Sequence, residues 1–235
     1  MYTFRPWNNP TDQERAIGKY TDSIDLLYPG NDSSSAEYFN KHIKPTPNLY
    51  YADGDKDLMF YAINQIGIDG LVLEFGTWKG YSVNYIAGQL PNRLIHGFDV
   101  FNTDNVSFKE GADWNGHDFT QAELPLVKSN VQLHAGWFHR TLPGFVEKHP
   151  EPCALLHIDC DNYDGTVDVL KYVNIAVGTI IVFDEYINVP NWEVNEHKAW
   201  LEYCTENGVK YEFIAINTKH QQLAIRINDL QINAN

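Results

Sequence analysis

Four carboxylates follow two apolar segments of the chain, and their spacing could support metal chemistry. Asp159 and Asp161 end the segment CALLHIDCD, and Asp184 and Glu185 end the segment TIIVFDEY. Acids at the ends of neighbouring buried strands repel one another unless a partner offsets their charge. All of these ligands are oxygen atoms, which favours Mg²⁺ or Ca²⁺ over Zn²⁺. We predict a divalent-metal site formed by Asp159, Asp184 and Glu185.

The same acids have simpler interpretations. Asp161 is placed to cap a helix that begins near Tyr163, which is a common role for Asp. One acid could also pair with a lysine while the others face water.

If a metal does bind, it could hold a hydroxyl and lower the pKa of that hydroxyl. Asp159 is then a candidate base, as are His139 and His197, although a single histidine is more often structural.

A second chemical feature is the turn LVLEFGTWKG. Gly76 and Gly80 permit a tight turn and a close approach to the main chain, and the following helix presents free N–H groups. The turn departs from the G-x-G-x-x-G pattern of dinucleotide sites, because Glu74 precedes it and its glycines are four residues apart. An acid there suits a cationic amine, and Asp99, at the end of the next apolar segment, suits ribose hydroxyls. Amine and ribose together indicate S-adenosylmethionine. The alternative is an ordinary structural turn with a solvated acid.

The elements that must position these residues alternate between strand-like and helix-like patterns from residue 71 onward. Apolar, β-branched strands alternating with helices predict a parallel sheet covered on both faces. The last two strands are joined by the short NTKH and should pair antiparallel. We therefore predict an α/β fold, a Rossmann-like doubly wound sheet of seven strands, mostly parallel with one antiparallel strand. The expected strands are 71–76, 94–101, 131–138, 153–161, 179–186, 211–216 and 221–227, and the expected helices include 56–66, 82–90, 142–150, 166–177 and 195–207.

We expect two regions in the chain. Residues 1–55 are predicted to form an N-terminal helical cap or lid, with helices near 13–27 and 35–43. Residues 56–235 are predicted to form the Rossmann-like domain that binds the cofactor. The polar segment 102–129 within it is predicted to be a lid or acceptor loop.

Composition excludes several classes of protein. The 235 residues carry 31 acidic and 17 basic side chains, a net charge of −14, which argues against nucleic acid as a partner. No apolar run approaches the roughly 18 residues of a membrane helix. The polar N-terminus is no signal peptide, and the cysteines Cys153, Cys160 and Cys204 show no metal-binding spacing. We expect a cytoplasmic protein with reduced thiols.

Five blocks of the sequence resemble the macrocin O-methyltransferase family. They read LEFGTWKGYS, GFDVF, GWFHRTLPGF, LLHIDCDNYDGTVDVL and GTIIVFDEYINVPNWEVNEHKAW, and the resemblance covers about residues 71 to 227. The family holds class I S-adenosylmethionine-dependent enzymes, known best for methylating sugar or phenolic hydroxyls of natural products with Mg²⁺. The resemblance implies that fold, that activity and a small-molecule acceptor. Relatives commonly pair, so a homodimer is one possible assembly.

The resemblance also implies roles for individual residues. Asp159, Asp184 and Glu185 would bind the metal, and Asp159 would assist deprotonation. Asp99 would hold the ribose, and Gly136, Trp137 and Phe138 would lie near the adenine. The full set of expected cofactor-binding residues is Glu74, Gly76, Thr77, Gly80, Ser82, Asp99, Gly136, Trp137, Phe138 and Asp159.

Two departures from the family pattern affect what the resemblance implies. This chain reads FDVFNTDN where relatives often read like FDSFEGLP, which bears on the local cofactor and lid contacts. It carries His139 and Arg140 where relatives usually have an acid beside TLP. The metal blocks are intact.

Two other functions remain open at this point. One is a nicotinamide-dependent oxidoreductase on a similar fold. Against it, this chain shows neither G-x-G-x-x-G nor a Tyr-x-x-x-Lys pair. The other is a non-catalytic binding module. The acceptor itself, whether sugar, phenol, carboxylate or peptide, cannot be read from the sequence because acceptor loops vary freely on a fixed scaffold.

Overall fold

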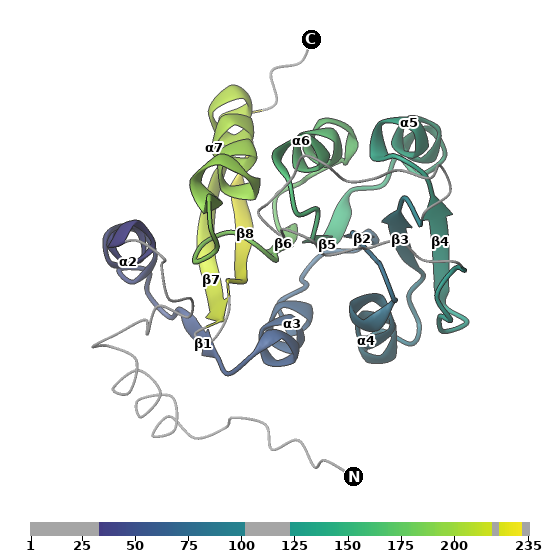
Figure 1. Cartoon of the computed structure of the whole chain (residues 1–235), viewed down its shortest axis with the longest axis horizontal. Coiled ribbons are helices and arrows are strands. Elements are labelled where there is room, and N and C mark those ends of the chain that lie inside the picture. The colour runs from purple at the N-terminus through teal and green to yellow at the C-terminus, as the bar shows by residue number, and fades with distance from the viewer. Residues whose placement is uncertain (1–32, 102–122, 218–220, 232–235) are drawn as a thin grey trace.

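The computed structural model describes residues 33–101, 123–217 and 221–231. A single sheet of eight strands crosses the molecule in the order β1-β7-β8-β6-β5-β2-β3-β4 (Figure 1). Only β8 runs against its neighbours, β6 and β7, and the other pairings are parallel. The strands are β1 (Tyr50–Ala52), β2 (Leu71–Phe75), β3 (Ile95–Asp99), β4 (Val131–Ala135), β5 (Cys153–Ile158), β6 (Ile180–Phe183), β7 (Lys210–Asn217) and β8 (Leu223–Asp229).

The predicted fold class is confirmed, with one strand more than the seven expected. The additional strand, β1, pairs in parallel with β7 at the sheet edge and lies inside the 1–55 segment expected to be helical. It has three residues, too few to show an alternating pattern, and it follows the helix-breaking Pro45 and Pro47. The expected helix at 35–43 is present as α2 (Ser33–Tyr38) and the π-helix η1 (Phe39–Ile43). The expected helix at 13–27 lies outside the described residues.

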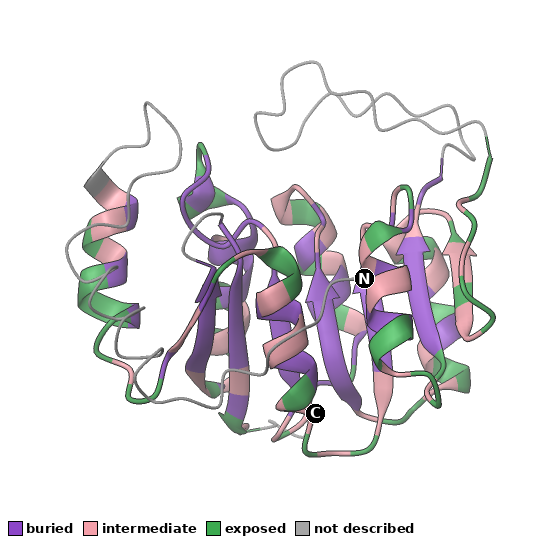
Figure 2. Cartoon of the chain, turned by 90° about the horizontal axis from the view of Figure 1, so that it is seen from below, coloured by how far each residue is buried: buried purple, intermediate pink, exposed green. Residues whose placement is uncertain are grey.

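Helices cover both faces of the sheet, as a doubly wound fold requires. Figure 1 shows α3 (Asp55–Asn64) and α4 (Tyr81–Gln89) on one face, and α5 (Phe138–Lys148), α6 (Tyr163–Tyr172) and α7 (Glu196–Asn207) on the other. A short 3₁₀ helix, η2 (Trp192–Val194), precedes α7. The central strands are buried almost throughout, whereas the edge strand β4 has no buried residue, and the helices turn one side to solvent (Figure 2).

Two apolar cores form because side chains alternate between the faces of each strand. Val72 and Leu155 pack with α3 and α4 residues such as Leu58 and Ile86. Their neighbours on the same strands, including Leu156, pack on the other face with α5, α6 and α7, where Trp200 is fully buried. This double-sided burial holds the strand ends, and with them the polar residues that follow, at one edge of the sheet.

Two helix ends bear on the predictions. Asn162, and not Asp161, caps α6, because its Oδ1 accepts the main-chain N–H of Gly165 at 2.8 Å. Asp161 has a positive φ of 58° and stays with the acidic group described below. Gly208 ends α7 in the left-handed conformation.

Part of the expected 102–129 loop is described. Residues 102–122 lie outside the described residues, but the stretch from 123 runs along α4. There Asn84 donates to the carbonyl of Leu126 and accepts the N–H of Lys128. In the part of the chain that the structure describes, no helix has the length and apolar character to cross a membrane.

Candidate active site

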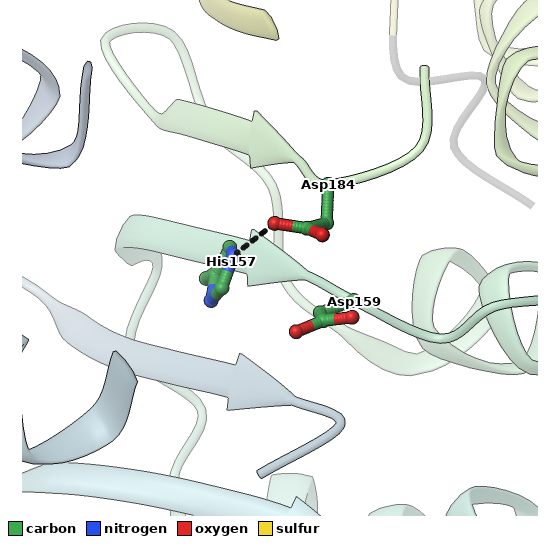
Figure 3. Close-up of side chains that lie close together, drawn as sticks. All are labelled: His157, Asp159 and Asp184. Carbon is green, nitrogen blue, oxygen red and sulfur yellow. Dashed lines mark ion pairs between the residues drawn. The ribbon is translucent and has the colours of Figure 1, made fainter. Parts of the chain in front are cut away.

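The predicted metal ligands lie at the carboxyl edge of the sheet, divided between two groups that share Asp159. Among the described residues, two groups bring their ligand atoms within 4.8 Å of one another, and both contain Asp159. One adds His157 and Asp184 (Figure 3), and the other adds Asp161 and Glu185. The three predicted ligands therefore come from the ends of the adjacent strands β5 and β6, and Asp161 belongs with them.

The electrostatics of these acids suit a bound cation. Burial, with the charge of Asp184 next, raises the pKa of both Asp159 and Glu185 well above the usual range of a carboxyl. Glu185 is 3% exposed, and its Oε2 has no hydrogen-bond partner among the described residues. A divalent cation would relieve the repulsion and satisfy this oxygen. The group of Asp159, Asp161 and Glu185 offers only oxygen ligands, which fits Mg²⁺ or Ca²⁺.

Asp184 is balanced differently from its neighbours. Burial pushes the pKa of Asp184 upward, but the nearby His157 and a hydrogen bond from Gln222 outweigh burial and leave this pKa below its usual value. The Nε2 of His157 lies 3.7 Å from the Oδ1 of Asp184. Asp184 therefore stays ionised more readily than Asp159 and Glu185, whose pKa values are raised.

Glu74 contacts a histidine that the sequence analysis did not consider. Its Oε2 lies 3.0 Å from the Nδ1 of His157, and the two residues are 0% and 2% exposed. Burial lowers the pKa of His157, but Asp184 and Glu74 outweigh it and raise this pKa well above the usual value. The Oε1 of Glu74 is buried without a partner among the described residues, so one acceptor remains for an amine. The acid expected to face a ligand thus also balances a buried imidazolium.

A buried acid on α7 joins the two acidic strand ends, and sequence reasoning missed it. Glu196 is 0% exposed. Its Oε1 accepts the main-chain N–H of Cys160 at 3.2 Å, and its Oε2 accepts that of Glu185 at 3.1 Å. Burial raises the pKa of Glu196 to about 8, with a further contribution from Asp184. Glu196 therefore braces the chain segments that follow β5 and β6.

The structural reason for a glycine at position 76 differs from the expected approach of a ligand. A Cβ there would lie 1.7 Å from the carbonyl oxygen of Asp159, and the φ of Gly76 is 93°. The main-chain N–H of Asp159 also donates to the carbonyl of Phe75 at 2.8 Å. What approaches Gly76 closely is therefore the protein's own main chain at Asp159, directly after β5, and the glycine allows Asp159 to lie beside the turn.

The rest of the turn contacts Asp99, as expected for a cofactor site. The N–H of Trp78 donates to Oδ2 of Asp99 at 2.6 Å, and that of Phe101 donates to Oδ1 at 3.3 Å. Gly80 precedes α4 with a φ of 78°. Thr77 is buried, and Ser82 lies partly exposed in the first turn of α4. The turn and Asp99 therefore lie side by side.

The segment after β4 reaches the same place. Gly136 donates its N–H to the carbonyl of Asp99 at 2.9 Å. Trp137 precedes α5, and Phe138, the first residue of that helix, packs edge-on against Phe75 with ring centroids 5.2 Å apart. The structure thus brings together the glycine turn, Asp99 and residues 136–138 beside the acidic groups.

The two candidate histidines lie outside both acidic groups. His139 is half-exposed on α5, with its Nδ1 3.4 Å from Oδ2 of Asp168. His197 is 6% exposed, and burial, with a smaller effect of His42, lowers its pKa to about 4. The rings of Tyr38, Tyr186 and Trp192 surround it. Of the three candidate bases, only Asp159 lies among the clustered acids.

A comparison with protein families identifies the chain. The family model described as Macrocin-O-methyltransferase (TylF) matches residues 57–221. The chain belongs to the macrocin-O-methyltransferase family. This O-methyltransferase is S-adenosylmethionine-dependent, which confirms the predicted enzyme class and sets aside the nicotinamide-dependent alternative.

Solved structures give the same fold for this O-methyltransferase. The apo structure of CalS11, described as a TDP-rhamnose 3'-O-methyltransferase of calicheamicin biosynthesis, is 20% identical with a TM-score of 0.54, covering 97% of this chain and 98% of that one. A second CalS11 structure is 17% identical with the same TM-score, covering 97% and 96%. At this identity the likeness supports the fold. No curated protein matches the chain significantly.

Proposed function

We propose that this O-methyltransferase methylates a hydroxyl of a sugar, or of a similar small natural product, with the help of a divalent cation. The carrying observation is the group of carboxylates beside the glycine turn: Asp159, Asp184 and Glu185 lie at adjoining strand ends, and two of them have pKa values raised well above the usual range. The sugar acceptor is supported by the family's name and by the activity printed for CalS11. The net charge of −14 favours such an acceptor over nucleic acid.

The cofactor site uses the residues that meet around Asp99. Asp99 would accept hydrogen bonds from the ribose hydroxyls. The Oε1 of Glu74, which has no partner among the described residues, would accept a hydrogen bond from the cofactor's amine. Residues 136–138 lie near the adenine, and the turn from Gly76 to Ser82 encloses the remainder. When bound, S-adenosylmethionine supplies an electrophilic methyl group on its sulfonium.

The acidic groups hold the cation and the acceptor's proton. Asp159, Asp184 and Glu185 bind the cation, and Asp161 lies within reach as a further oxygen ligand. A cation held by these residues would lower the pKa of a hydroxyl in contact with it. Asp159 is the group that would take the proton from that hydroxyl, because it is the one candidate base that lies among the clustered acids. Holding the acceptor oxygen in line with the methyl group accounts for much of the rate.

Three measurements on the purified chain test these parts separately. Calorimetry with S-adenosylhomocysteine measures cofactor binding, and failure to bind would contradict the cofactor site. Mass spectrometry of reactions with nucleotide sugars, glycosides and catechols identifies the acceptor class, and methylation of catechols alone would contradict the sugar assignment. Transfer that persists in excess EDTA would contradict the role of the cation.

A matched pair of variants tests the acids. Asp159→Asn should abolish transfer while leaving S-adenosylhomocysteine binding within a few-fold of the wild type. Glu193→Gln removes an exposed acid from the segment after β6 and should leave transfer unchanged. Equal activity in both variants would rule out Asp159 as the base.

A further inference from the structure

A hydrogen-bond donor and a histidine nitrogen approach the same oxygen of Asp184. The side-chain amide of Gln222, just before β8, donates to Oδ1 through Nε2. The Nε2 of His157 lies 3.7 Å from that same Oδ1. Figure 3 shows one oxygen of Asp184 directed toward His157 and the other turned away from it. Because a carboxylate is planar, groups gathered at one oxygen set the direction of the other.

The amide of Gln222 is itself held in one orientation. Asn217, the last residue of β7, donates from Nδ2 to Oε1 of Gln222 at 3.2 Å. Since the carbonyl oxygen of Gln222 accepts from Asn217, its NH₂ group must face Asp184. The main chains of the two residues are also joined, by the N–H of Asn217 and the carbonyl of Gln222 at 3.0 Å.

The chain of hydrogen bonds ends at an acid on α3. The Nδ2 of Asn217 also donates to Oδ1 of Asp55, the first residue of that helix, at 2.8 Å. Asn217 and Gln222 are 2% and 7% exposed, so solvent competes little for these bonds. We call the residues Asp55, Asn217 and Gln222 the amide relay. It leads from the end of β7, past the start of β8, to Asp184 after β6, at the sheet edge where the acidic groups lie.

A neutral donor is the appropriate group to orient a metal-binding carboxylate. His157 already brings a positive charge to this oxygen of Asp184, and a lysine or arginine in the place of Gln222 would add a second charge that opposes a cation bound nearby. An amide donates a hydrogen bond while leaving the negative charge available. We propose that Gln222 is a positioning residue that directs Asp184 toward the divalent cation, and that Asn217 and Asp55 hold the Gln222 amide in its working orientation. This inference rests on the proposed function, since it takes Asp184 as a metal ligand.

Calorimetry tests the proposal by measuring the direct binding of Mg²⁺ and Mn²⁺ to the full chain without an acceptor. Gln222→Met removes the donor at similar size, and Gln222→Glu keeps the shape but replaces the donor with a carboxylate. Losing a hydrogen bond to a charged group should weaken ion binding about tenfold or more in Gln222→Met. In EDTA, affinity for S-adenosylhomocysteine should stay at the wild-type value. In turnover, the metal concentration for half-maximal rate should rise more than the rate at saturating metal falls.

The neighbouring glutamine supplies a matched control. Gln221 is equally buried at 7% exposed, and its Oε1 has no hydrogen-bond partner among the described residues. Gln221→Met should bind the ions as the wild type does. Asn217→Ala should weaken ion binding, and the double variant with Gln222→Met should bind no more weakly than Gln222→Met, because Asn217 acts through Gln222.

The outcomes separate this inference from the proposed function. If the wild type binds neither ion, the metal part of the proposed function fails and the relay's role fails with it. If the wild type binds and a folded Gln222→Met or Gln222→Glu binds equally well, the relay alone is refuted. An equal loss in Gln221→Met would also refute it, since the effect would then be a general disturbance before β8. Should Gln222→Met fail to fold, Gln222→Glu and Asn217→Ala decide the matter by the same binding measurement.

Discussion

Glu74 of β2 and His157 of β5 stand opposite one another in the register of two parallel strands, with their side chains in contact. The Oε2 of Glu74 lies 3.0 Å from the Nδ1 of His157, and both residues are buried. Nε2 of His157 faces Asp184, so the imidazolium lies between two carboxylates. This relationship links the cofactor turn to the acidic groups through a single side chain.

Replacing His157 should therefore be costly for stability. His157→Phe fills the space but leaves Glu74 and Asp184 without the charge between them, and breaking a buried ion pair costs about 3–5 kcal/mol. Urea unfolding in EDTA measures the change. His139→Phe is the control, since His139 is half-exposed and should shift stability by less than about 0.5 kcal/mol. Comparable losses in the two variants would contradict the role assigned to His157.

The close approach at Gly76 predicts a severe effect of the smallest substitution. Gly76→Ala places a methyl group against the carbonyl of Asp159 at a positive φ, so the strand ends must separate. We expect a loss of about 4 kcal/mol or more, or failure to fold.

Gly144, inside α5, is the control, because a Cβ there meets nothing within 4 Å. Gly144→Ala should be neutral, or stabilising by up to about 1 kcal/mol, from helix propensity. Thermal unfolding of both variants decides the point. A near-native melting temperature for Gly76→Ala would show that β2 and β5 do not approach as described.

Glu196 predicts that the metal-free protein loses stability as pH rises. Its folded pKa of about 8 lies above the roughly 4.5 of an unfolded glutamate, so the folded protein holds an extra proton between these values. Stability from this group is therefore full below the unfolded pKa and declines as pH rises through that window. Melting temperatures in EDTA should fall across it, and more gently in Glu196→Gln. Parallel curves for the two proteins would refute the prediction.

A histidine pair on β3 and β4, near the other end of the strand order, predicts the opposite trend of stability with pH in acid. The Nδ1 of His96 lies 3.0 Å from the Nε2 of His134, next to His149 and Phe145. Burial first, and then the neighbouring histidines, lower both pKa values to about 4. An unfolded histidine titrates near 6.5, so the unfolded chain binds more protons between these values.

Stability should consequently fall as pH drops from about 6.5 to about 4. His134→Phe removes one titrating group, keeps a ring to stack on Phe98, and should flatten the acid limb of a melting-temperature profile. His139→Phe should leave that limb as it is in the wild type. An unchanged slope in His134→Phe would mean that other groups cause the acid sensitivity.

The sequence by itself determined the fold class, the seven longer strands and the enzyme class. Apolar segments that alternate with helices predict a parallel sheet, and such a sheet brings the residues after its strands to one edge. The sequence alone therefore places Asp99, Asp159, Asp184 and Glu185 at the same edge. The family blocks identified the enzyme class because they lie in these same strand ends. These inferences succeed because strand periodicity and strand ends are local properties of the chain.

Only the tertiary structure decided which partners those residues meet. His157 lies within a strand, Glu196 begins α7 and Gln222 precedes β8, and nothing local marks them as neighbours of the acids. The reason for Gly76 was likewise hidden, because the atom that approaches it belongs to Asp159, far along the chain. The three-residue β1 is a strand only because β7 lies beside it. In each case the contact depends on strand order and register, which are set by packing both faces of the whole sheet and not by the residues nearby in sequence.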